Sequence, residues 1–80
     1  MNKEMVLIQW HDAKFCPGSH TEEEALKHEM ALFDSLGYLV SKDELTTFLA
    51  TEQDSEGKFR DITLIPTGSI VSIKKLQVVP

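Results

Sequence analysis

Residues 65–76 read IPTGSIVSIKKL, and this stretch decides the fold that the sequence predicts. Pro66 has no backbone N–H and cannot continue a hydrogen-bonded ladder, so residues 66–69 predict a tight turn or one turn of 3₁₀ helix. Residues 70–76 follow this turn, are rich in β-branched side chains and predict a short final strand. Such a turn can fold the final strand back onto an earlier one and close a small sheet.

The chain before this turn predicts four more strands, separated by polar or glycine-containing segments. They cover residues 5–10, 32–41, 45–52 and 59–65. Gly57 ends the polar segment between the last two and can adopt the positive φ that a hairpin turn requires. Five short strands cannot bury their apolar side chains in one flat sheet of this size, whereas a barrel buries one face and leaves no exposed edge.

A helix is predicted between the first two strands, and its end is ambiguous. Thr21 and Glu24 have the spacing of a capping box, and Leu26, Met30 and Phe33 follow at helical intervals. In one interpretation Gly37 caps a helix of residues 22–35. In the other, the helix covers about residues 22–31 and a long strand follows. We prefer the second, because otherwise the strand at 45–52 has only residues 38–41 to pair with.

The predicted fold is therefore mostly β: a five-stranded small barrel with one helix inserted after strand 1, in a single domain of residues 1–80 with a tail at 77–80. The order of elements and the stretch IPTGSIVSIKKL resemble the SH3-like and Sm-like small barrels. The SH3-like resemblance implies a long excursion after strand 1 and a 3₁₀ turn before strand 5. The stretches WHDA (10–13) and LGYLVSKDE (36–44), with IPTGSIVSIKKL, are similar to short phage and bacterial proteins of uncharacterised activity, so they carry over no functional residues.

Composition restricts the classes of partner. The net charge of −5 combines −8 over residues 1–57, from four lysines and twelve acids, with +3 over residues 58–80, from four bases and one acid. The negative charge of residues 1–57 repels a phosphate backbone, so the net charge of the chain disfavours a dedicated nucleic-acid binder. One cysteine and an apolar amino-terminal run too short for a signal or a membrane span predict a cytoplasmic protein that does not enter a membrane.

Residues 10–20, WHDAKFCPGSH, concentrate reactive side chains and raise the question of a metal or thiol site. The candidate metal ligands are His11, Cys16, His20 and His28. Structural zinc sites use ligands paired two to four residues apart, and this spacing is missing here. A catalytic Cys16 would need a base and an orienting group fixed by several elements, but all candidates lie in one loop. We therefore predict no cofactor and no enzymatic activity.

Two further groups are candidate binding surfaces. Trp10, His11 and Tyr38 could form an aromatic surface for a ligand or an extended peptide, of the kind that SH3-like barrels use. The basic side chains near the carboxyl end could form a stripe on neighbouring strands that contacts nucleic acid, as in an Sm-like ring. They are Lys58, Arg60, Lys74 and Lys75.

The function predicted from sequence is that of a small, non-enzymatic interaction or accessory module. Self-association is expected, because a domain of 80 residues gains much from covering apolar surface with a copy of itself. The alternative is a protomer of an Sm-like, nucleic-acid-binding ring. A metal- or thiol-dependent site within residues 11–28 is the third hypothesis.

Overall fold

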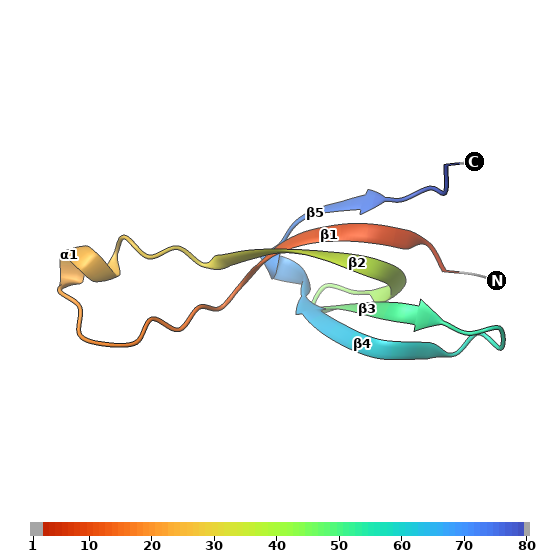
Figure 1. Ribbon diagram of the computed structural model, residues 1–80, viewed down its shortest axis with the longest axis horizontal. Helices are drawn as coiled ribbons and strands as arrows, with labels where there is room; N and C mark the ends of the chain where they lie inside the picture. The colour runs from red at the N-terminus through yellow and green to blue at the C-terminus, as the bar shows by residue number, and fades with distance from the viewer. Residues whose placement is uncertain (1–2, 80) are drawn as a thin grey trace.

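The computed structural model describes residues 3–79 and contains five antiparallel strands in one sheet, in the order β4-β3-β2-β1-β5 (Figure 1). The mostly β prediction is confirmed. The elements are β1 (Met5–Asp12), α1 (Glu22–Ala25), β2 (Ala31–Lys42), β3 (Thr46–Gln53), β4 (Phe59–Pro66), the 3₁₀ turn η1 (Thr67–Ser69) and β5 (Ile70–Lys75).

The core lies on one face of the sheet. Val6 and Ile8 are two positions apart in β1, so their side chains point to the same face of the sheet. There they contact Leu49 of β3 and Ile65 of β4. All four side chains are buried. Four partly buried residues complete the cluster: Trp10, Leu39, Ile70 and Ile73. The strand pattern of the sequence is thus explained by a core that all five strands share.

The final strand folds back as the 65–76 stretch predicts. Pro66 ends β4, η1 follows, and β5 then pairs antiparallel with β1, with Ile8 opposite Ile73. The sheet is nevertheless not closed into a barrel. Within residues 3–79 the ladder ends at β4 on one side and at β5 on the other, so both remain edge strands. The 3₁₀ turn brings the chain from one edge of the sheet to the other without joining the edges.

The helix is shorter than predicted, and the choice of a long strand after it is confirmed. Helix α1 contains only Glu22–Ala25 instead of about residues 22–31, while β2 runs from Ala31 to Lys42. Met30 precedes β2 and Phe33 lies within it, opposite Trp10. The helical spacing was misleading because a strand paired with β1 satisfies its backbone as fully as a helix does and also packs Phe33 against Trp10. A helix standing away from the sheet would leave Phe33 without this contact.

The capping box forms in a modified way. The Thr21 hydroxyl accepts a hydrogen bond from the Glu24 backbone N–H (3.1 Å). The same hydroxyl donates to the Glu24 carboxylate at 3.2 Å. One residue pair therefore closes the single turn of α1 from both directions.

A hydrogen-bonded turn fixes β3 to η1. The Asp43 carboxylate accepts from the backbone N–H groups of Leu45 (2.8 Å) and Thr46 (2.7 Å). The Thr67 hydroxyl donates to the Asp43 carbonyl and lies 2.9 Å from the hydroxyl of Thr47. Because the Thr67 proton is used, Thr47 is the donor in this pair. The fully buried Thr47 hydroxyl is thereby satisfied, as a buried polar group requires.

The same turn gives the protein a pH-dependent contribution to stability. Hydrogen bonds from the N–H groups of Thr46 and Leu45 hold the pKa of Asp43 below its ordinary value of 3.8. Because the folded chain binds the ionised carboxylate better than the unfolded chain does, the fold is stabilised at any pH above the unfolded-state pKa of Asp43. This stabilisation is lost as the pH falls through the lower, folded-state pKa. The free energy of unfolding should decrease on acidification from about pH 5 to pH 2, and we expect this decrease to be smaller in Asp43→Asn than in the original protein. Urea unfolding at each pH measures it. Glu44→Gln, which removes a charge from the same turn, is the control. An unchanged pH profile for Asp43→Asn would show that this carboxylate is not a source of the pH dependence.

Candidate functional site

The most prominent surface feature is a projection that we call the arm, residues 13–30. The hairpin of β1 and β2 continues past the rest of the sheet, because the pairing of β5 with β1 stops at Trp10 and Ile70. The arm extends beyond this point and carries α1 near its end (Figure 1). The molecule measures 53 × 25 × 22 Å, with a radius of gyration of 16.2 Å. A compact domain of this length has a radius of gyration of about 12 Å.

The arm is acidic and carries large apolar side chains in contact with solvent. Phe15 is 87% exposed and Leu26 is 78% exposed, and Met30 is exposed as well. Four glutamates and two lysines give the arm a net charge of −2. Apolar side chains on a charged projection do not stabilise a monomer, so this composition is typical of a contact surface.

The exposed area supports this interpretation. The accessible surface is 6508 Å² for a chain of 9.0 kDa. A compact monomer of this mass exposes about 4,900 Å², so the excess is about 1,600 Å². A standard protein–protein interface covers about 800 Å² on each partner. The chain therefore exposes more than enough additional surface to form one specific interface.

The structure brings together two of the four candidate metal ligands. The rings of His20 and His28 meet edge to face at 4.9 Å between centroids, and His28 Nε2 lies 3.4 Å from His20 Nδ1. His20 Nε2 lies 3.2 Å from the carbonyl of Pro17. No cluster of three potential ligands occurs within residues 3–79, so His11 and Cys16 do not complete this pair. The two histidines meet because the single turn of α1 reverses the chain between them. Their separation of eight residues in the sequence did not indicate this contact.

The aromatic surface expected from Trp10, His11 and Tyr38 does not form. Trp10 lies on the core face, 5.7 Å from the ring of Phe33, and its indole N–H donates to Ser35 at 3.1 Å. Tyr38 is paired with Met5, which points to the other face of β1. His11 shares that face, but it lies six positions further along the strand than Met5, a distance of about 20 Å.

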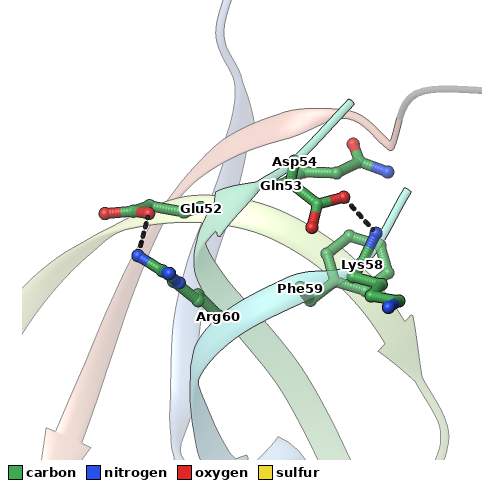
Figure 2. Close-up of a pocket in the computed structure, with 6 residues that line it drawn as sticks. All are labelled: Glu52, Gln53, Asp54, Lys58, Phe59 and Arg60. Atoms are coloured by element: carbon green, nitrogen blue, oxygen red, sulfur yellow. Dashed lines mark hydrogen bonds and ion pairs between the residues drawn. The ribbon is translucent and has the colours of Figure 1, made fainter. Parts of the chain in front are cut away.

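The predicted basic stripe is divided between the two edges of the sheet. Lys58 and Arg60 lie on the β3–β4 hairpin, at one edge, whereas Lys74 and Lys75 lie on β5, at the other. Figure 2 shows the first pair among the residues that line a hollow on this hairpin. The volume of the hollow is about 380 Å³. Three of these bases face carboxylates in ion pairs: Lys58–Glu56 (3.5 Å), Arg60–Glu52 (3.5 Å) and Lys75–Glu4 (3.3 Å). A continuous track for a phosphate backbone is therefore not assembled.

A second apolar surface, which the sequence interpretation missed, covers the face opposite the core. We call it the outer face. Met5, Leu36, Tyr38 and Leu76 line a hollow of about 320 Å³ there, and Leu36 is 61% exposed. The signal was present in the sequence MVLI at residues 5–8, because a strand that is apolar at consecutive positions needs cover on both faces.

Lys74 adds a positive charge to this outer face. Leu7 pairs with Leu36 on one side and with Lys74 on the other, so the three side chains point to the same face. The outer face thus combines an apolar hollow with an adjacent positive charge.

No family model matches the chain, and no curated protein or solved structure shows significant similarity to it. Within residues 3–79, no helix is long and apolar enough to cross a membrane.

Proposed function

We propose that the protein is a small, non-enzymatic interaction module that binds another protein chain through its arm. The exposed arm carries this proposal, because its large apolar side chains are in contact with solvent. The excess area of the whole chain, about 1,600 Å², is enough for one protein interface. The negative charge of the arm favours a protein surface over nucleic acid, since phosphates repel it.

We also propose that the sheet is an SH3-like small barrel in an open form. The position of β1 between β2 and β5, the long excursion after β1 and the 3₁₀ turn before β5 support this assignment. In this arrangement the sheet serves as the scaffold, and the excursion between β1 and β2 supplies the binding element.

A photo-crosslinker placed in the arm tests the proposed function. Phe15 is replaced by benzoylphenylalanine, an aromatic residue of similar shape, and the cells that make the protein are irradiated. We expect a covalent adduct with a protein, since Phe15 is 87% exposed in the arm. Leu45, which is 80% exposed in the β2–β3 turn, is the control position and should give no adduct. Adducts with nucleic acid alone, or none from residue 15, would contradict the proposal.

A further inference from the structure

Resting on the proposed role of the arm, we propose that its partner is a second copy of this chain. The tip of each arm packs on the outer face of the other copy, so two chains exchange arms. Leu26 of one copy enters the hollow beside Leu36 and Tyr38 of the other. The acidic run of α1 then lies against Lys74.

The two surfaces are complementary in shape and charge. On the arm, three glutamates at positions 22–24 directly precede Leu26, which is 78% exposed. On the sheet, a hollow of about 320 Å³ has room for a leucine side chain and is lined in part by Leu76. Lys74 precedes Leu76 by two residues and lies on the same face as Leu7 and Leu36. The arm carries a net charge of −2, whereas Lys74 contributes a positive charge to the outer face. Lys75 points to the core face and is paired with Glu4. Opposite charges on one chain favour contact between copies and orient the encounter.

The dimensions of the molecule allow a closed, two-fold arrangement. The arm and the sheet lie at opposite ends of the long axis of the molecule, which measures 53 Å (Figure 1). Two copies lying antiparallel can therefore each place an arm on the sheet of the other. The same contact is made twice, which closes the assembly at two chains.

Charge reversal tests this contact, with the dimer dissociation constant measured by sedimentation equilibrium. Because each contact occurs twice, we expect Lys74→Glu and Glu22→Lys each to raise the dissociation constant about 10-fold. Both changes in one chain should restore it to within about 3-fold of the original value. Lys58→Glu makes the same charge change at the opposite edge of the sheet and should leave the constant unchanged.

Removal of the apolar contact is the second test of the proposed interface. Leu26→Asp should raise the dissociation constant at least about 100-fold, since a charge replaces the inserted side chain at both contacts. Leu45→Asp is the matched control, because Leu45 is 80% exposed and lies outside the arm. All these positions are exposed, and circular dichroism of each variant verifies that the sheet is retained.

The possible results separate this inference from the proposed function. A dissociation constant unchanged by Leu26→Asp or by Lys74→Glu, or a chain that stays monomeric at every concentration, overturns arm exchange. If a monomeric chain still forms the residue-15 adduct with a different protein, the arm is an interaction element and only its partner was misidentified. Loss of that adduct altogether contradicts the proposed function itself.

Discussion

Gly37→Ala is expected to lower the free energy of unfolding by about 2–3 kcal/mol, a large part of the stability of a domain this small. Gly37 lies in β2, opposite Val6, where the strand leaves its partner β1 and approaches β3. A Cβ atom at this position would overlap the carbonyl oxygen of Ala50 and lie 3.0 Å from Cγ of Leu49. The backbone of β3 would have to move, and the core residues attached to it would move as well.

Gly68→Ala is the matched control for this substitution. Gly68 lies in η1, and a Cβ atom built on it meets nothing within 4 Å. Alanine also restricts the unfolded chain, so this variant should be neutral or stabilised by about 0.5 kcal/mol. Urea unfolding of both variants measures the difference. Equal effects at Gly37 and Gly68 would mean that the close approach of β2 to β3 does not constrain the fold.

Replacement of the arm by a two-residue turn is expected to leave the sheet folded and to abolish self-association. Asp12 and Ala31 are directly paired, so Asn-Gly between them makes a short hairpin in place of residues 13–30. The core cluster lies outside the arm and should be retained. The radius of gyration should fall from 16.2 Å to about 11 Å, the value of a compact chain of the remaining length.

Small-angle X-ray scattering and thermal unfolding verify this expectation together. A shortened chain that is monomeric, compact and cooperatively unfolded separates the arm from the scaffold. Leu26→Asp in the full chain is the companion variant, because it keeps the length of the arm and removes only its exposed leucine. An unfolded shortened chain would show that the arm stabilises the sheet, and a shortened chain that still dimerises would assign association to another surface.

The strands could be predicted because their local signals agree with the final structure. Pro66 stops β4, Gly57 has a φ of +84° in the β3–β4 turn, and the residues after η1 form β5. The closure of the sheet could not be predicted in the same way. Whether two edge strands meet depends on the twist and the bulges of the whole sheet, such as the register shift between Leu39 and Ser41.

The candidate site was harder to predict than the fold. Trp10 lies in β1 and Tyr38 in β2, but whether their side chains share a face depends on the register of the two strands, which the sequence does not state. The spacing of Leu26 and Met30 predicts that both lie on one face of a helix. In the structure both lie in the arm, and both are exposed. The sequence shows that both side chains are apolar, but it does not indicate that they lie far from the sheet.

The molar mass of the unmodified chain across a concentration series tests the arm-exchange interface most directly. Light scattering from low to high micromolar concentration should show the mass rising from 9.0 kDa and levelling off at twice that value. A plateau at two chains is the result that reciprocal arm exchange requires. A mass that stays at 9.0 kDa throughout, or that rises without a plateau, would contradict it.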